Sequence, residues 1–203
     1  MLTKLVQQRW FYNFAIWAFR TWARLFLGLR VSGTENIPAR GGVVVACNHF
    51  SSLDPPIVGV SVPREIHFMA KRELFDRPVS RLLFLGLRAF PVNRGRNDTG
   101  ATRTGLRKLQ AGLAVGIFIQ GTRSSTETAA LRGAAFLALR GNAVLVPTSV
   151  WREGRAYRVH FGTPIDTARE GLSPAEVTIE LVTAINSELP EEQRMLISQQ
   201  ADA

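Results

Sequence analysis

Cysteine is almost absent from this sequence: Cys47 is its single cysteine in 203 residues. One cysteine excludes an internal disulfide and fits a reducing compartment. Long apolar runs are missing near the N-terminus too, where the longest, residues 14–19, is far shorter than the roughly 18 to 20 residues that span a bilayer. Trp, Phe and Arg are mixed through this region, unlike a signal peptide. We therefore expect neither a spanning helix nor a cleaved leader.

Acidic residues are scarce relative to basic ones. The chain has 16 Asp and Glu against 25 Lys and Arg, a formal net charge of +9. This excess predicts anionic partners, such as nucleic acid, an anionic membrane or phosphorylated substrates. Hydrophobic residues make up 46% of the chain and charged residues 20%, a composition that excludes intrinsic disorder. The length, without an internal repeat, predicts one domain.

Residues 4–27 predict an amphipathic helix. At about 100° per residue, one narrow stripe is polar and comprises Arg9, Asn13, Arg20 and Arg24. The opposite face carries Trp10, Phe11, Phe14, Trp22, Leu25 and Phe26, with Trp17 nearer its boundary. Such a helix can lie in an anionic membrane interface, with its arginines against lipid phosphates. The alternative is a helix whose apolar face packs on the core.

After Gly33, apolar strand-like runs alternate with helix-like segments. Strands are predicted at residues 42–47, 65–70, 89–93, 116–119, 143–150 and 157–161. Helices are predicted at residues 55–60, 79–87, 98–111, 128–140 and 174–188. This alternation predicts an α/β fold: a single domain with a mixed, mostly buried sheet flanked by helices and preceded by the amphipathic helix. We divide the chain into the helix (1–28), the domain (29–190) and a polar C-terminal tail (191–203).

Residues that can do chemistry follow the first strong strand. His49 and Asp54 lie five positions apart in a predicted turn, beyond a strand end, where open α/β sheets bind ligands. Imidazole, with an unperturbed pKa of about 6.5, can accept a proton near neutral pH, and a carboxylate on its other nitrogen would fix the tautomer. The alternative is structural: Asp54 precedes Pro55 and would suit a helix N-cap, and an isolated histidine is often merely hydrogen-bonded.

Groups that suit phosphate follow other strands. The candidates are Lys71, Arg94, Gln120, Gly121, Thr122 and Arg123. Glycine lets backbone N–H groups approach an anion, and arginine can bind phosphate oxygens in a bidentate way. Because each candidate follows a strand end, they can converge on one anionic group. The alternatives are an ordinary strand-exit turn and solvated surface cations.

Taken together, these segments resemble the lysophospholipid and glycerolipid acyltransferase family in both order and spacing. His49 and Asp54 are similar to its His-x4-Asp catalytic block. The second, third and fourth blocks are matched by Lys71 through Arg94, Gly121-Thr122-Arg123-Ser124 and Val146-Pro147. The resemblance implies acyl transfer from acyl-coenzyme A or acyl carrier protein to a lysophospholipid hydroxyl. It makes 1-acylglycerol-3-phosphate the expected acceptor and phosphatidic acid the expected product.

The same resemblance implies a role for each residue. His49 would be the general base and Asp54 would orient it, while Lys71, Arg94 and the 120–123 turn would hold the acceptor. Pro147 would shape the site near the acyl chain. Neither a metal nor a resident cofactor is implied, and direct transfer suits a chain without a Gly-x-Ser-x-Gly nucleophile elbow. We expect a peripheral or monotopic protein at the cytoplasmic face of a membrane.

One departure from the family pattern concerns the acceptor. The family's third block usually begins Pro-Glu-Gly-Thr-Arg, whereas this chain has Ile119 and Gln120 in place of the proline and glutamate. Glutamine hydrogen-bonds but brings no charge. Another lysolipid or glycerol-3-phosphate therefore stays open as acceptor, as do a thioesterase-like hydrolase and a basic, non-catalytic membrane-binding module. Nucleic acid is disfavoured, because the aromatic and basic residues cluster on an apolar-faced helix.

Overall fold

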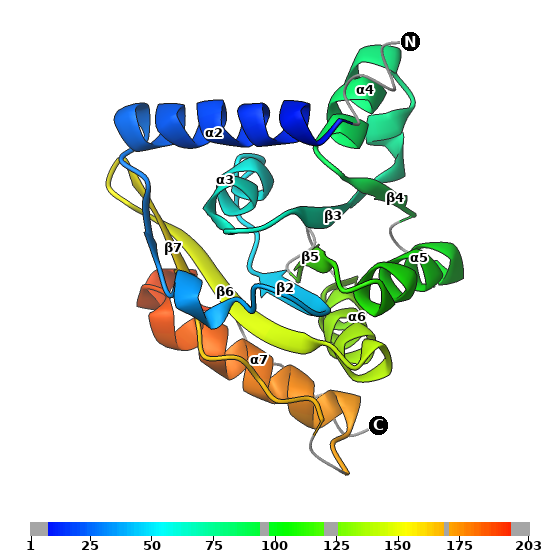
Figure 1. The fold of residues 1–203 in the computed structure, drawn as a ribbon. Helices are drawn as coiled ribbons and strands as arrows, with labels where there is room; N and C mark the ends of the chain where they lie inside the picture. Colours follow the sequence, from blue (N-terminus) through cyan, green and yellow to red (C-terminus); the bar gives the residue numbers. More distant parts are fainter. Residues whose placement is uncertain (1–7, 94–97, 120–125, 169–170, 196–203) are drawn as a thin grey trace.

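The computed structural model describes residues 8–93, 98–119, 126–168 and 171–195 (Figure 1). The strands are β1 (Arg30–Ser32), β2 (Val43–Cys47), β3 (Ile66–Lys71), β4 (Phe90–Val92), β5 (Ala114–Phe118), β6 (Val144–Glu153) and β7 (Ala156–Phe161). The α-helices are α2 (Arg9–Phe26), α3 (Asp54–Ser61), α4 (Pro78–Gly86), α5 (Thr99–Gln110), α6 (Thr126–Gly141) and α7 (Pro174–Glu188). Short 3-10 helices are η1 (Thr34–Asn36), η2 (Arg72–Phe75) and η3 (Glu191–Gln193).

These strands form one mixed sheet in the order β1-β7-β6-β2-β5-β3-β4. Neighbouring strands are parallel except β6 and β7, which are antiparallel and register Thr148 with Phe161. The predicted α/β fold with a mixed sheet is thus confirmed. The edge strand β1 was not predicted, because three residues with one apolar side chain carry too little pattern to read.

Helices cover both faces of the sheet, with α2 and α3 on one face and α5, α6 and α7 on the other (Figure 1). All five residues of the central strand β2 are buried. Val43 and Val45 pack with Ile57 of α3, whereas Val44 packs with the helices of the other face. Because both faces of β2 are covered, its sequence is continuously apolar rather than alternating.

The N-terminal helix α2 packs on α3 through its inner side. Tyr12 and Ala23 are buried there, and the Tyr12 hydroxyl accepts a hydrogen bond from the Ile66 N–H. Arg20 also faces inward: its guanidinium donates to the carbonyl oxygens of Val60 and Val62, at the C-terminal end of α3. The interfacial alternative put Arg20 against lipid phosphates, whereas here it binds the end of α3, because helix-end carbonyls need a donor.

The outer side of α2 is apolar and aromatic. Trp10, Phe14, Trp17, Leu25 and Phe26 are each more than half exposed. Arg9 and Arg24 are exposed as well. In the part of the chain that the structure describes, no helix combines the length and apolar character needed to cross a bilayer.

The segment after α7 belongs partly to the domain. Met195 is 8% exposed and joins the core, and the Asn186 side chain makes two hydrogen bonds of 2.8 Å to its backbone. Met195, which falls within the predicted polar tail, therefore packs on the domain; a single apolar side chain in a charged stretch gave no sign of this packing. Residues 196–203 lie outside the described residues.

Candidate active site

The carboxyl ends of β2 and β5 meet at a point where the chain leaves the sheet in opposite directions. β2 leads into α3 and on to β3, whereas β5 leads towards α6 and on to β6. Figure 1 shows α3 and α6 on opposite sides of the sheet. Adjacent parallel strands with diverging connections leave a crevice beyond their carboxyl ends, where α/β proteins bind ligands. His49 and Asp54, which follow β2, stand at this edge.

The predicted contact between His49 and Asp54 is present. The His49 Nδ1 atom lies 3.1 Å from Asp54 Oδ2. The same oxygen accepts hydrogen bonds of 2.7 Å from the backbone N–H groups of Phe50 and Ser51. The Asp54 side chain is buried, whereas the His49 side chain keeps 17% of its surface exposed. The carboxylate thus fixes both the turn and the ring that the turn carries.

The alternative role for Asp54 as a helix N-cap is not what the structure has. α3 begins at Asp54 itself, and no side chain caps that helix. The carboxylate points back into the turn, where it accepts from the imidazole and from two main-chain donors. Since Nδ1 faces Asp54, proton acceptance in a reaction falls to Nε2, the arrangement of a base with its orienting carboxylate.

The turn from Asn48 to Asp54, the His49 turn, is anchored to β6 by Asn48. Its side chain is fully buried, donates to the Val150 carbonyl at 2.6 Å and accepts from the Val150 N–H at 2.7 Å. Main-chain pairing of β2 with β6 ends just before, at Cys47 and Thr148. The Asn48 side-chain amide therefore makes the two hydrogen bonds to Val150 that a backbone partner would otherwise make. The main chain is thus free to leave the sheet towards His49. Sequence reasoning missed this role, although an asparagine directly after a continuous apolar run is a usable signal.

An aromatic surface supports the imidazole. The His49 and Phe118 ring centroids are 4.7 Å apart, and Phe118 stacks on Phe68 at 5.5 Å. The stack depends on Gly116 in β5, because a Cβ there would come within 2.3 Å of the Phe68 ring. The contact with the Phe118 ring and the hydrogen bond with the Asp54 carboxylate together restrict the rotation of the His49 side chain.

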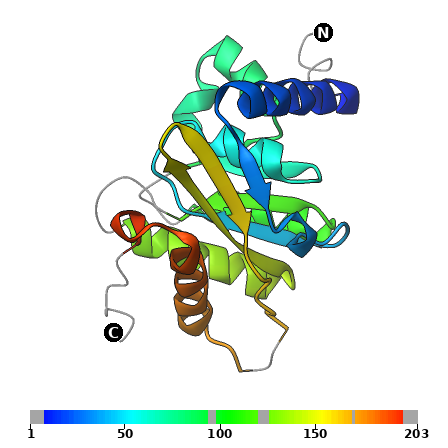
Figure 2. The same cartoon turned by 90° about the vertical axis from the view of Figure 1, so that its left-hand side faces the viewer.

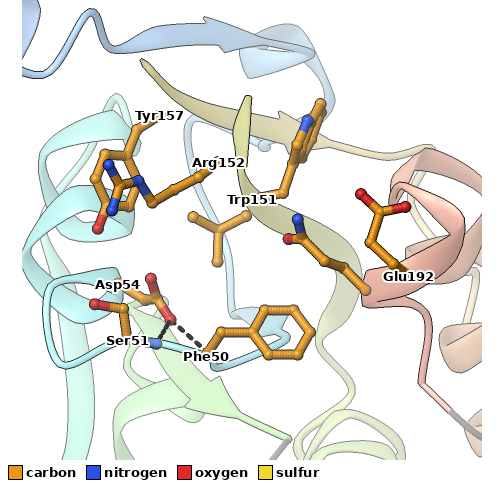
Figure 3. Close-up of a pocket in the computed structure, with 9 residues that line it drawn as sticks. Phe50, Ser51, Asp54, Trp151, Arg152, Tyr157 and Glu192 are labelled. Atoms are coloured by element: carbon orange, nitrogen blue, oxygen red, sulfur yellow. Dashed lines mark hydrogen bonds between the residues drawn. The ribbon is translucent and has the colours of Figure 1, made fainter. Parts of the chain in front are cut away.

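A cavity of about 380 Å³ opens beside the His49 turn. Its lining comprises Phe50, Ser51, Asp54, Val150, Trp151, Arg152, Tyr157, Glu192 and Gln193. In Figure 3 the turn residues lie along one side, and the Arg152 guanidinium lies over the Tyr157 ring, 5.4 Å from its centroid. Trp151 and Arg152 were missed because they lie past the predicted strand end, and the β6–β7 pairing that brings in Tyr157 cannot be read from the sequence.

The other predicted residues have different outcomes. Lys71 is the last residue of β3, at the same edge of the sheet, and its Nζ lies 3.5 Å from a Glu73 carboxylate oxygen. Pro147 is buried inside β6, paired with Ala46, and is not among the cavity residues. The remaining five, Arg94, Gln120, Gly121, Thr122 and Arg123, lie outside the described residues. Their part in binding stays a prediction.

A cysteine nucleophile is disfavoured by its surroundings. Cys47 is 1% exposed, and burial raises the pKa of its thiol well above the usual range, with the nearby Asp54 charge adding to the shift. A reactive thiolate needs the opposite shift. Among the described residues, no group of three or more His, Cys, Asp or Glu side chains could hold a metal ion.

Known proteins include relatives of this chain with similar sequences. A family model described as Acyltransferase matches residues 28–151. A 1-acyl-sn-glycerol-3-phosphate acyltransferase of Bacillus subtilis (strain 168) is 32% identical over 191 residues, which are 89% of this chain and 96% of the relative. A protein with the same name from Borreliella burgdorferi is 26% identical over 125 residues, 60% of this chain and 50% of that protein.

A solved structure has a similar fold. The crystal structure of the 1-acyl-sn-glycerophosphate (LPA) acyltransferase, PlsC, from Thermotoga maritima superposes with a TM-score of 0.72. The match covers 94% of this chain and 83% of that one, at 23% sequence identity. At this identity the likeness concerns the fold alone.

Proposed function

Because the chain belongs to the PlsC-like acyltransferase family, we propose that it transfers an acyl chain from a thioester donor to the free hydroxyl of a lysophospholipid. The proposed acceptor is 1-acylglycerol-3-phosphate, which the names of the relatives contain, and the product is phosphatidic acid. The observation that carries the proposal is the His49–Asp54 contact at the carboxyl edge of the sheet, inside the matched region.

In the proposed reaction, His49 Nε2 takes the proton of the acceptor hydroxyl as its oxygen attacks the thioester carbonyl carbon. The tetrahedral intermediate then collapses, the carbon–sulfur bond breaks, and the departing thiolate takes the proton from the imidazolium. Asp54 stabilises that imidazolium through Nδ1, 3.1 Å away. No acyl-enzyme is needed, in keeping with the buried Cys47. The donor is acyl-coenzyme A or acyl carrier protein.

The acceptor phosphate would be bound at the same edge. Lys71 ends β3 there, and by resemblance Arg94 and the turn of Gln120, Gly121, Thr122 and Arg123 would complete the anion site, because guanidinium groups and glycine N–H groups suit phosphate. Pro147, buried beneath the edge, would act through packing rather than by touching the acyl chain.

The lipid substrate calls for a membrane surface. We propose that α2 lies in the interface of an anionic membrane, at its cytoplasmic face, with Trp10, Phe14 and Trp17 among the acyl chains. These side chains are 58–63% exposed, and burying them in lipid would favour attachment. Arg9 and Arg24 would lie at the headgroups.

Product analysis tests the proposed activity. Purified protein is incubated with radiolabelled acyl-coenzyme A in detergent micelles, with and without 1-acylglycerol-3-phosphate. The proposal predicts labelled phosphatidic acid in the presence of acceptor and little free fatty acid in its absence. Equal release of fatty acid with and without acceptor would show a hydrolase and reject acyl transfer.

A second assay addresses the acceptor. Wild type and Gln120→Glu are compared on 1-acylglycerol-3-phosphate, other lysophospholipids and glycerol-3-phosphate. Because Gln120 lacks the charge of the family's glutamate, we expect the substitution to change the relative rates on these acceptors. An unchanged order would mean that position 120 does not select the acceptor.

A further inference from the structure

Helix α4 is apolar, yet it buries none of its large side chains. It contains Val79, Leu82, Leu83, Phe84 and Leu85, all half-buried or exposed, and Gly86 is its one buried residue. Val79 and Leu83, one turn apart on the same side, are 82% and 54% exposed. A helix that exposes large apolar side chains is normally covered by protein or by lipid.

Few contacts hold α4 to the rest of the domain. It packs on η2, where the Phe84 and Phe75 ring centroids are 5.8 Å apart and the Ser80 hydroxyl donates to the Leu74 carbonyl. Leu74 itself is 38% exposed. The apolar surface of α4 and η2 therefore projects from the domain rather than closing its core.

Basic residues surround this apolar surface. Arg72, Arg77 and Arg81 are all exposed. Residues 71–86 contain four basic and two acidic side chains, and one acidic group, Glu73, lies 3.5 Å from Lys71. An apolar centre with arginines around it matches an anionic bilayer, whose acyl chains accept the centre and whose phosphates attract the rim.

The position of α4 agrees with a lipid partner. Figures 1 and 2 show α2 and α4 at the same end of the molecule, with α3 between α2 and the sheet. Arg88, just after α4, lies over the ring of Tyr12 in α2, 5.6 Å from its centroid. This contact joins the segment after α4 to the inner side of α2, so one membrane surface can meet both helices.

We infer that α4 is a second membrane-binding element, which inserts Val79 and Leu83 into the acyl boundary of an anionic bilayer while Arg77 and Arg81 meet the headgroups. Two separated contacts, α2 and α4, set the tilt of the domain as well as its attachment. α4 follows β3, whose last residue, Lys71, lies at the same edge of the sheet as the His49 turn. Binding through both helices would therefore tilt the domain so that this edge faces the lipid. The inference rests on the proposed association of the protein with membranes.

Flotation with vesicles of phosphatidylcholine and phosphatidylglycerol tests the inference. The double variant Val79→Asp/Leu83→Asp should partition into vesicles at least about tenfold more weakly than wild type, since it lacks two apolar side chains that wild type would bury in lipid. Both positions are exposed, so the fold should persist. Ile179→Asp is the matched control: Ile179 is 45% exposed on α7, at the opposite end of the molecule, and its change should leave partitioning unaltered.

A fluorescent label reports insertion directly. Bimane is attached to Val79→Cys or, as a control, to Ile179→Cys; the native Cys47 is buried with a raised pKa and should resist labelling. We expect brominated lipids to quench the label at position 79 and to leave that at position 179 unaffected. Equal quenching at both positions, or at neither, would contradict insertion of α4.

Other outcomes locate a failure. Trp17→Asp weakens α2 alone; if it lowers partitioning while the α4 double variant floats like wild type, α4 does not bind lipid. If wild type does not float, membrane association fails and the inference with it, whereas acyl transfer in micelles is judged separately. If the α4 double variant keeps vesicle binding but loses transfer from acyl carrier protein, the surface binds that protein and the inference is overturned.

Discussion

Two histidines in this molecule lie near a carboxylate, but their surroundings differ. His49 Nδ1 lies 3.1 Å from Asp54 at the carboxyl edge of the sheet. His67 Nε2 lies 3.7 Å from Glu65, and His67 is inside β3 with 8% of its side chain exposed. Burial, together with the positive charges of Lys108 and Arg88, lowers the pKa of His67 to about 4.

The carboxylates differ as well. Glu65 also pairs with Arg88, 3.0 Å away, whereas Asp54 Oδ2 is held by the imidazole and two backbone N–H groups. His49 lies beyond the carboxyl end of β2 and keeps 17% of its side chain exposed, whereas His67 is part of a packed strand. A histidine beside a carboxylate therefore indicates catalysis only where the pair is oriented and a substrate can reach it.

Replacing Asp54 or Glu65 by the corresponding amide should give the largest difference between the two histidine–carboxylate pairs. We expect Asp54→Asn to lower kcat about 10³-fold with little change in KM, because the amide no longer favours the productive tautomer or the imidazolium. Glu65→Gln should leave kcat within about twofold, since Glu65 does not adjoin the reacting groups. Steady-state kinetics of ester formation check both, and similar losses in the two variants would contradict the distinction.

Asn48 should contribute both to stability and to the positioning of His49. Asn48→Ala leaves the N–H and C=O of Val150 without their partners, so we expect a loss of about 2–4 kcal/mol in the free energy of unfolding. It should also lower kcat about tenfold, because the turn that carries His49 loses its anchor. Urea unfolding and initial rates measure the two effects.

Asn186 supplies the matched control for that variant. Its side chain binds the Met195 backbone with two hydrogen bonds of 2.8 Å, far along the chain from the His49 turn. Asn186→Ala should lose stability but keep kcat. If both variants lowered kcat equally, the effect of Asn48 would be one of general stability.

Acid should affect the buried histidine through stability. The pKa of folded His67, about 4, lies below the unfolded value of about 6.5, so the unfolded chain binds more protons between these pH values. Stability is therefore lost as pH falls from about 6.5 to about 4, by up to about 3 kcal/mol from this group. His67→Gln should show a correspondingly flatter loss in urea titrations. If the free energy of unfolding of His67→Gln fell with pH as steeply as that of wild type, the lowered pKa of His67 would be rejected.

The sequence predicted the parts of the fold that depend on local pattern. The run Val43-Val44-Val45 indicated a strand covered on both faces, and the spacing of His49 and Asp54 indicated a contact across a turn. Both predictions are confirmed. Each depends on residues close together in the sequence, whose geometry the backbone largely dictates.

What the sequence could not predict depends on distant partners. Arg20 sits in a polar stripe, but its hydrogen bonds go to carbonyls 40 and 42 residues away. Asn48 acts on Val150, 102 positions along the chain. The cavity lies between the His49 turn and residues of β6, β7 and η3. Helical periodicity and residue type show which side chains are polar, not which distant groups they meet.

The most direct test of the account compares the two histidines in one assay. Acceptor-dependent formation of phosphatidic acid is measured for wild type, His49→Ala and His67→Gln, with circular dichroism to check folding. We predict that His49→Ala loses about 10²–10⁴-fold in kcat while remaining folded, and that His67→Gln keeps most of its activity near neutral pH. A folded His49→Ala protein with wild-type transfer would contradict the assignment of His49 as the base.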